Sequence, residues 1–567
     1  MKLSKFINHK FLLFLGTFSK LIEVVLELFL PIFMGLMIDE GIKKNNTQTV
    51  YLMLFLILLF ATLGYLTTVF AHFLTAKVSQ NYHHNLRLAL YEKVLNMKYE
   101  DRKKYSTSSL LNRLNNDTLQ TSNALAMTMR ILSRAPFLMI GSIVALYITS
   151  PNVSYVSMIV LPLTFVFVLI LVLMLLRFNQ RLQKEMDRSS SLVKETLDGI
   201  QVIKSFHKEE PTYKNFKNQN QLIVNLQRML GYISTLGSPV VSLVLNLALV
   251  FMIYISAIDI NLGSMTQGQV LSMINYTTQL ILSMLGILNL IILYAKAFTS
   301  NERIKEILNY ENENTLVKTE SLDDIETIEF KNVSFAYKGQ KEFLKNINFK
   351  LTKGQSYGMI GLTGSGKSTI LKMLVGFLKP TEGEILINNR PMSTYSLNDI
   401  RRLVGYVSQE NYLFQGTVKD NLSMGFNYED ESIIQALYDS EYPMNQGQIQ
   451  NEVKKMGLNF SGGQRQRLNI ARALTKKPSI LLLDDALSSL DNQTILNLKN
   501  NLLKHKDSWI LMISSSKLSH IDFVDEWIVI SQNEIETVGK KDEVLKTSPL
   551  VQKLSITQHE LEEVSHV

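Results

Sequence analysis

The fold of this chain is decided by the stretch Gly361-Leu362-Thr363-Gly364-Ser365-Gly366-Lys367-Ser368-Thr369. A short apolar run at 356–360 precedes it and predicts a strand, and the run 370–375 follows with the periodicity of a helix. A strand, a glycine-rich turn and a helix in this order form a phosphate-binding loop, in which backbone N–H groups and the positive end of the helix dipole surround phosphates. We therefore expect an α/β domain built around a nucleotide.

Two side chains of this loop have specific roles in such a site. Lys367 is expected to reach the β- and γ-phosphates, and the hydroxyl of Ser368 to ligate Mg²⁺. The other expected contacts of the loop with the nucleotide come from Gly361, Thr363, Gly364, Ser365, Gly366 and Thr369. The predicted cofactors are ATP and Mg²⁺. A chance glycine turn is the alternative, and the flanking strand and helix argue against it.

The composition predicts more than one domain and a membrane-embedded part. At 567 residues the chain is too long for a single core, and only 19% of its residues are charged, against about 25% in ordinary soluble domains. The shortage of charge lies almost entirely before about residue 300. There are no cysteines, which excludes disulfides and thiolate metal sites. The net charge of +8 is assigned to cytoplasmic loops, so we expect no nucleic acid partner.

Six apolar stretches in the first half are candidates for membrane spans, each of which needs about 20 residues of helix. They are 11–38, 51–76, 135–150, 153–176, 229–258 and 261–295. Lysine and arginine crowd the segments 77–134 and 177–228, whereas the connections near 150–152 and 259–261 carry neither. The positive-inside rule then places both termini and the two long basic segments in the cytoplasm. Because these segments look helical, spans two to five are expected to project beyond the membrane.

Six polar residues within the predicted spans are candidates for a substrate cavity: Lys20, Glu23, Glu27, Asn275, Gln279 and Ser283. The first three share one helix face, and the last three form a stripe at i, i+4 and i+8. Charges at this depth normally face a bundle interior or a water-filled cavity, so we hypothesise that both stripes line one cavity. Both stripes also have an explanation without a substrate. The first is explained by a Lys20–Glu23 ion pair with a partly protonated Glu27, and the second by hydrogen bonds between helices.

The second half has the pattern of a nucleotide-binding domain. The polar segment 309–315 lacks apolar periodicity, and β-rich and helical runs alternate from Ile325 onward. We predict a membrane domain at 1–308, a linker at 309–324 and an α/β nucleotide-binding domain at 325–567.

Two further motifs follow the phosphate loop. The stretch Phe460-Ser461-Gly462-Gly463-Gln464 opens a helix and forms a second anion site, with free N–H groups at a positive dipole end. The buried strand 480–484 ends in Asp484, whose carboxylate can hold the hydration shell of Mg²⁺. Two phosphate-binding helix starts in one polypeptide indicate that the second serves a nucleotide bound to another copy or to a partner.

With these motifs in this order, the chain resembles an ABC transporter half-subunit of the exporter type over nearly its whole length. The resemblance implies a six-helix membrane domain followed by an ATPase domain, ATP hydrolysis coupled to transport, a dimer, and a bacterial plasma membrane with the ATPase domain in the cytoplasm. It also implies that Tyr337 stacks on adenine, that Gln409 approaches Mg²⁺, that Ser461, Gly462, Gly463 and Gln464 form the signature, and that 488–491 form the D-loop. The segments 98–101, 111–117 and 195–204 resemble cytoplasmic coupling regions.

Two departures from this family pattern concern hydrolysis. Asp485 occupies the position of the usual glutamate after Asp484, and Ser516 occupies that of the usual switch histidine. His520 lies four residues later and is a poor substitute. Aspartate is one methylene shorter, and serine cannot span the distance that an imidazole does; loss of a general base alone costs about 10²–10⁴-fold in rate. We expect this site to bind ATP and to hydrolyse it poorly.

A chain of this kind resembles the degenerate-site subunits of bacterial heterodimeric multidrug exporters, whose signature completes the partner's site. A slow homodimeric exporter, an importer on the same fold and an ATP-gated regulatory subunit remain alternatives. Cationic amphiphiles, lipids and peptides all suit an apolar cavity with a few charges.

Overall fold

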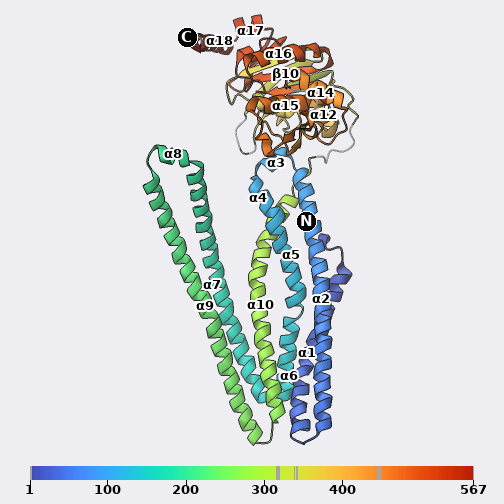
Figure 1. Ribbon diagram of the computed structural model, residues 1–567, viewed down its shortest axis with the longest axis vertical. Coiled ribbons are helices and arrows are strands. Elements are labelled where there is room, and N and C mark those ends of the chain that lie inside the picture. Colours follow the sequence, from blue (N-terminus) through green and yellow to red (C-terminus); the bar gives the residue numbers. More distant parts are fainter. Residues whose placement is uncertain (1–2, 314–319, 338, 340–342, 444–447, 566–567) are drawn as a thin grey trace. The chain divides into compact units, whose positions relative to one another are not determined.

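The computed structural model describes residues 3–313, 320–337, 339, 343–443 and 448–565 (Figure 1). The chain forms two compact units. The first comprises Met1–Leu95 and Tyr105–Tyr310, and the second comprises Asn96–Lys104 and Glu311–Val567. The predicted boundaries at residues 308 and 325 remain a proposal, and the structure adds the short segment near residue 100 to the second unit.

The first unit is entirely helical in its described residues. Its α-helices are α1 (Lys10–Leu36), α2 (Thr47–Leu95), α4 (Thr107–Asn112), α5 (Thr118–Met127), α6 (Ala135–Thr149), α7 (Pro151–Asp198), α8 (Ile200–Ser205), α9 (Glu209–Asn261) and α10 (Gln267–Leu308). Shorter helical segments are η1 (Leu3–Phe6), η2 (Met37–Ile42), η3 (Arg113–Asp117) and η4 (Thr128–Leu132). The last three are π-helical and interrupt the α-helices beside them.

Among the described residues, five helical segments are long and apolar enough to cross a membrane: Lys10–Ile42, Thr47–Leu95, Thr107–Thr149, Ser154–Asp198 and Ser242–Asn261. The sixth long helix is α10, whose sequence carries no charge from 267 to 295. The predicted last span started at 261, which is too early, because α9 ends at that residue and α10 begins at Gln267. Gly263, with a φ of +74°, lies in the turn between them.

Three helices of this unit are much longer than a bilayer is thick. The lengths of α2, α7 and α9 are 49, 48 and 53 residues, which correspond to about 70–80 Å at 1.5 Å per residue. The hydrocarbon core is only about 30 Å thick, so these helices extend beyond it, as the sequence predicted. Helices α7 and α9 pack along each other and are joined at their tips by α8 (Figure 1).

The second unit contains two main sheets. One is four-stranded, in the order β2-β1-β4-β5, and the other is six-stranded, in the order β12-β11-β3-β10-β9-β6. The strands of the first are β1 (Thr327–Phe335), β2 (Leu344–Thr352), β4 (Glu382–Ile387) and β5 (Arg390–Pro391). Those of the second are β3 (Ser356–Gly361), β6 (Val404–Val407), β9 (Ile480–Asp484), β10 (Ile510–Ser515), β11 (Glu526–Ser531) and β12 (Glu534–Gly539). A third pair joins β7 (Gly416–Thr417) to β8 (Glu452–Val453).

The six-stranded sheet fixes where the site lies. Every residue of β3, β9 and β10 is buried, as expected of parallel strands covered on both faces. The parallel pairing brings the carboxyl ends of β3, β9, β10 and β6 to one edge, which is where ligands bind in sheets of this kind. The helices of the unit are α3 (Tyr99–Lys103), α11 (Lys367–Leu374), α12 (Leu397–Leu403), α13 (Val418–Ser423), α14 (Asp430–Asp439), α15 (Gly462–Thr475), α16 (Asn492–Lys504), α17 (Lys541–Thr547) and α18 (Pro549–Ser565). The predicted all-α first domain and α/β second domain are confirmed.

Candidate functional site

The glycine-rich loop connects β3 to α11 and has a backbone that only glycine permits. Gly364 and Gly366 have φ values of +84° and +104°, a region that is strained for other residues. A Cβ on Gly361 would lie 2.6 Å from the carbonyl oxygen of Ile530, and one on Gly366 would clash with a methyl group of Leu344. The loop is therefore held close to its neighbours, and it delivers the chain to the N-terminus of α11, where unpaired N–H groups can bind phosphate.

Asp484 gathers the polar groups at the end of β9. Its Oδ1 accepts hydrogen bonds from the hydroxyl of Ser368 at 2.8 Å and from that of Ser514 at 2.9 Å, and its Oδ2 accepts one from Tyr406 at 3.2 Å. The carboxylate is buried, with 3% of the residue exposed. Ser368 and Asp484 thus offer a hydroxyl and a carboxylate oxygen side by side, the hard oxygen donors that Mg²⁺ prefers. This donor set fits the predicted metal.

Lys367 lies over the same loop. Its Nζ donates to the carbonyl oxygens of Gly361 at 2.7 Å and Leu362 at 3.0 Å. Burial lowers the pKa of Lys367, whereas the nearby carboxylates of Asp485 and Asp484 act in the opposite direction. The lysine is therefore positioned within the phosphate loop and within the electrostatic reach of both carboxylates.

Tyr337 lies next to the phosphate loop, and its expected contact with adenine stays a prediction. Its hydroxyl is 3.0 Å from Oγ1 of Thr369 in α11, and its ring packs edge-on against Phe335 at 4.8 Å. The ring is partly buried and fixed at both ends. An aromatic surface anchored beside the phosphate loop is compatible with stacking on a base.

Gln409 follows β6, two residues beyond the end of the strand, and its side chain is exposed. Because Val407, the last residue of β6, pairs with Leu483, the segment that carries Gln409 leaves the sheet at the same edge as Asp484. Within the part of the chain that the structure describes, its side chain makes no hydrogen bond to the residues of the loop. Its predicted approach to Mg²⁺ stays a prediction.

The signature stretch forms the start of α15. Ser461 is the N-cap: its hydroxyl accepts from the N–H of Gln464 at 3.2 Å, and the amide oxygen of Gln464 accepts from the N–H of Ser461 at 2.9 Å. This capping box fixes the first turn. Ser461 and Gly462 are exposed, and a Cβ on Gly463 would lie 3.2 Å from the carbonyl oxygen of Ser489 in the predicted D-loop. The two motifs are neighbours, and the helix start is accessible from outside the unit.

Asp485 is held in an unusual backbone conformation directly after β9. Its φ is +50°, and its N–H donates to the carbonyl oxygen of Ser514 at 3.1 Å and to the Ser514 hydroxyl at 3.2 Å. Aspartate tolerates this left-handed region better than most residues. Burial and the adjacent Asp484 raise the pKa of the Asp485 carboxyl, and Lys367 and Lys517 oppose this. Its carboxylate therefore lies in the field of the phosphate-loop lysine.

Ser516 follows the last residue of β10 and is exposed, so position 516 is at the strand edge where the site lies. His520 is buried instead, with its Nδ1 3.0 Å from the hydroxyl of Ser515. Burial, followed by the charges of Lys517 and Lys499, lowers the pKa of His520 to about 4. This histidine is a neutral core residue at pH 7, which argues against it as a replacement for the switch histidine.

The charged candidates of the first unit are paired with one another. Lys20 Nζ lies 2.6 Å from Glu23 Oε2. Arg134, at the start of α6, donates to both carboxylate oxygens of Glu27 at 2.9 and 2.7 Å and lies 3.3 Å from Glu23. Arg134 was not among the predicted site residues. The signal was present in the sequence, since a charge that interrupts an apolar stretch needs a partner.

The polar stripe of α10 contacts α1 at one residue. The amide of Gln279 donates to the carbonyl oxygen of Glu27 at 3.4 Å and accepts from Ser142 of α6 at 3.3 Å. Asn275 and Ser283 donate to carbonyl oxygens of their own helix. The two stripes are therefore adjacent at Gln279, and all of these hydrogen bonds join protein groups to one another.

A pocket of about 630 Å³ lies among α1, α6 and α10. Its lining is mostly apolar, and none of the six predicted cavity residues is part of it; among the lining residues are Leu28, Phe29, Ile32, Val144, Ile148 and Tyr276. The predicted substrate contacts remain untested by this geometry.

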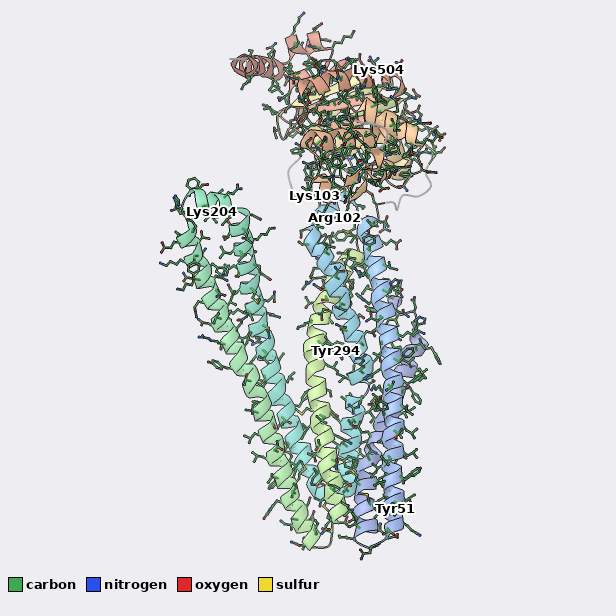
Figure 2. The ribbon with its side chains drawn as sticks, in the orientation of Figure 1. Tyr51, Arg102, Lys103, Lys204, Tyr294 and Lys504 are labelled. Carbon is green, nitrogen blue, oxygen red and sulfur yellow. The ribbon has the colours of Figure 1, made fainter. Side chains whose placement is uncertain are left out.

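The segment 96–104, which contains α3, belongs to the second unit. Figure 2 labels Arg102 and Lys103 of this helix. The ring of Tyr99 stacks on Phe377 at 5.2 Å, and Lys98 lies 2.5 Å from Glu311. On the other side of Phe377, the guanidinium of Arg401 lies 4.9 Å from the ring centre. A short helix from between two long helices of the first unit is thus integrated into the second.

Comparison with known proteins gives two family matches. Residues 13–284 match the family described as ABC transporter transmembrane region, and residues 344–488 match the family described as ABC transporter. The chain is 28% identical over 550 residues to the uncharacterised ABC transporter ATP-binding protein YfiB of Bacillus subtilis, covering 95% of each chain. It is 28% identical over 528 residues to a protein of Rickettsia bellii that is provisionally named an export ATP-binding/permease protein, covering 91% of each.

The fold also matches a solved structure of a bacterial Atm1-family ABC exporter with ATP bound. The TM-score is 0.81 at 19% identity, covering 97% of this chain and 98% of that one. At this identity the match shows the fold, and it extends over both domains.

The buried imidazole of His520 makes stability depend on pH. Because its folded-state pKa is about 4 and its unfolded value is about 6.5, the unfolded state binds the extra proton. The contribution is constant above about pH 6.5 and is lost as the pH falls from there toward about 4. In His520→Asn, which retains a polar atom near Ser515, the melting temperature of the full chain in detergent should fall less between about pH 7.5 and pH 5 than in the wild type. An equal fall in both proteins would contradict the assignment; His505→Asn, at a more exposed histidine, is the matched control.

Proposed function

The chain is an ABC exporter half-transporter, with a helical membrane domain followed by one ATPase domain, and from this premise we propose that it is one subunit of a heterodimer whose own ATP site is degenerate. It would bind ATP and Mg²⁺ through Lys367, Ser368 and Asp484, and hydrolyse ATP slowly. The assembly would export an amphiphilic compound, with multidrug efflux as the leading case, across a bacterial plasma membrane. The observation that carries the proposal is the side chain at position 485.

The reach of Asp485 is the first reason for slow hydrolysis. A general base must lie within hydrogen-bond distance of the attacking water, and aspartate is one methylene shorter than glutamate. A shift of the backbone could compensate, but the N–H of Asp485 is bound twice by Ser514 and its φ is +50°. The short carboxylate is therefore fixed to the sheet edge. Its raised pKa makes it a slightly better base, which does not replace the missing length.

Ser516 is the second reason. Its hydroxyl stays close to the backbone, whereas an imidazole at the same position extends several ångströms further toward the γ-phosphate. Since His520 is committed to the core through Ser515, the described part of the switch segment holds no other imidazole. The attacking water would lose both its base and its second anchor, and such positioning losses add to the cost of the missing base.

The signature supports a role in a partner's site. The capping box of Ser461 and Gln464 forms the first turn of α15 in advance, and the exposed Gly462 leaves room for a phosphate. A partner with a glutamate and a histidine at the corresponding positions would then have a competent site. In a homodimer both sites would be slow; the retained carboxylate of Asp485 near Lys367 is what keeps a slow homodimer as the second candidate.

The first test is ATPase activity of the purified chain alone in lipid nanodiscs. We expect the wild type to be indistinguishable from Lys367→Ala in turnover while binding a fluorescent ATP analogue that Lys367→Ala does not bind. The double variant Asp485→Glu, Ser516→His should raise turnover by about 10²-fold or more, because it restores the base and the anchor.

The matched control for that pair is Asp485→Asn, Ser516→Ala, which should stay at background. Wild-type turnover of about 1 s⁻¹ or more, within the ordinary range of enzymes, would show that Asp485 is an adequate base, and the slow-site proposal would then be wrong.

The second test concerns α3. Tyr99→Ala removes a stacked pair worth about 0.5–1.5 kcal/mol, so ATP binding should no longer change the first unit. We expect ATP to alter the tryptic cleavage of the basic segments 77–134 and 177–228 in the wild type and in Tyr213→Ala, an exposed tyrosine of α9, but not in Tyr99→Ala. Peptide mass spectrometry reads out the cleavage. A Tyr99→Ala protein that keeps the ATP response would contradict the coupling role of this contact.

A further inference from the structure

The membrane-spanning part of the first unit contains more fixed positive than negative charge. Within the apolar stretches 11–36 and 125–150, the lysines, arginines, aspartates and glutamates are Lys20, Glu23, Glu27, Arg130 and Arg134. The apolar stretches of the other spans, 51–76, 153–176, 229–258 and 267–295, contain none. Three cations therefore face two carboxylates, and no acidic residue in another span of this chain can make up the difference.

Four of these five residues form one cluster between α1 and the start of α6: Lys20, Glu23, Glu27 and Arg134. Lys20 contacts Glu23 at 2.6 Å, and Arg134 contacts both Glu23 and Glu27. Lys20 is 3% exposed. Both carboxylates are therefore used by Lys20 and Arg134 alone, and neither is left for the third cation.

Arg130 is that third cation. It lies in η4, one helical turn before Arg134, and within the described part of the chain it forms no ion pair. Its Nε is buried without a hydrogen-bond partner. His72 of α2 is within electrostatic range of both Arg130 and Lys20, which places Arg130 near the cluster. A partly buried cation without a counter-charge is costly, which makes Arg130 a candidate for binding an anion.

The neighbouring helices do not supply that anion. Tyr294 of α10, labelled in Figure 2, is hydrogen-bonded to Thr128 at the start of η4 and so marks this level on α10. Helix α10 has no acidic residue before Glu302, and α2 has only His72 as a titratable group between 66 and 76. These two helices therefore offer Arg130 no negative charge within the described part of the chain.

The position of the cluster fits a head group. Lys20 lies 16 residues before Leu36, the last residue of α1 (36 − 20), or about 24 Å along the helix. In a hydrocarbon layer of about 30 Å this is near the cytoplasmic boundary, where lipid head groups lie. Farther along α1 and α6 lies the pocket of about 630 Å³, whose lining begins at Val25, is mostly apolar and includes Asp39 and Glu40. An amphiphile with its charged end at the cluster would direct its apolar tail toward the apolar part of this lining.

We infer that Lys20, Arg130 and Arg134 bind the anionic group, a phosphate or carboxylate, of an amphiphilic substrate taken from the cytoplasmic side of the membrane. Arginine suits this role because its guanidinium forms paired hydrogen bonds with such oxygens. The inference rests on the proposed export function and narrows its substrate to anionic amphiphiles, since a cationic compound would meet an excess of like charge.

The test measures lipid binding to the full chain in neutral detergent. Phosphatidylglycerol should raise the melting temperature of the wild type, whereas phosphatidylcholine with the same acyl chains and inorganic phosphate alone should not. Arg130→Gln leaves two cations and two carboxylates, so it should weaken the apparent affinity for phosphatidylglycerol at least tenfold while the melting temperature without lipid stays equal or rises. Lys296→Gln, an exposed cation of α10, is the matched control and should behave as the wild type.

Three outcomes would overturn the inference. The first is an equal shift of the melting temperature with phosphatidylglycerol and phosphatidylcholine. The second is a full shift with inorganic phosphate alone, which would assign the site to a free anion. The third is an Arg130→Gln protein that is destabilised without lipid but retains the phosphatidylglycerol shift, which would indicate a structural arginine. None of these measurements involves ATP, so their failure is distinct from failure of the proposed hydrolytic asymmetry, which the ATPase comparison tests.

Discussion

The nucleotide-binding unit depends on one buried carboxylate. Asp484 ends a strand that is buried throughout, and a buried carboxylate is stable only when its oxygens are fully hydrogen-bonded. Its three hydroxyl partners come from three different elements: Ser368 from α11, Ser514 from β10 and Tyr406 from β6. These bonds set the distance between α11 and the sheet edge and so place the phosphate loop. The residue that follows, Asp485, inherits its position from the same arrangement.

The sequence predicted those parts of the structure that local patterns encode. The glycines of the phosphate loop, the buried strand before Asp484 and the capping sequence at Ser461 each have a local cause, and the structure places them on the expected elements. The apolar spans followed from length and charge. The sequence does not predict the ends of these spans well, because a π-helical segment such as η2 or η4 has no separate sequence signal. The new helix that begins at Ala135 does have one, since Pro136 lies in the first turn of α6.

What sequence reasoning missed depends on contacts between distant segments. Arg134 lies 107 residues from Glu27, and no periodicity links the two. Likewise, Tyr99 stacks on Phe377, and this contact joins α3 to the second unit. The segment 96–104 belongs to the second unit although residues 1–95 and 105–310 on either side of it belong to the first. The sequence could indicate that a partner was needed, whereas only the fold could identify it.

The conformation at position 485 connects backbone stability with the slow hydrolysis that we propose. With a φ of +50°, this backbone favours aspartate over glutamate, because the short side chain is the better tolerated in the left-handed region. A glutamate here would carry backbone strain, which is the kind of cost that active sites bear when catalysis requires it. The role that we propose for this site, to bind ATP and hold two ATPase domains together, has no such requirement, and aspartate then gives the more relaxed turn. The residue that shortens the reach to water is thus also the one that fits this backbone, so the aspartate at position 485 agrees with the proposed site, which binds ATP and hydrolyses it slowly.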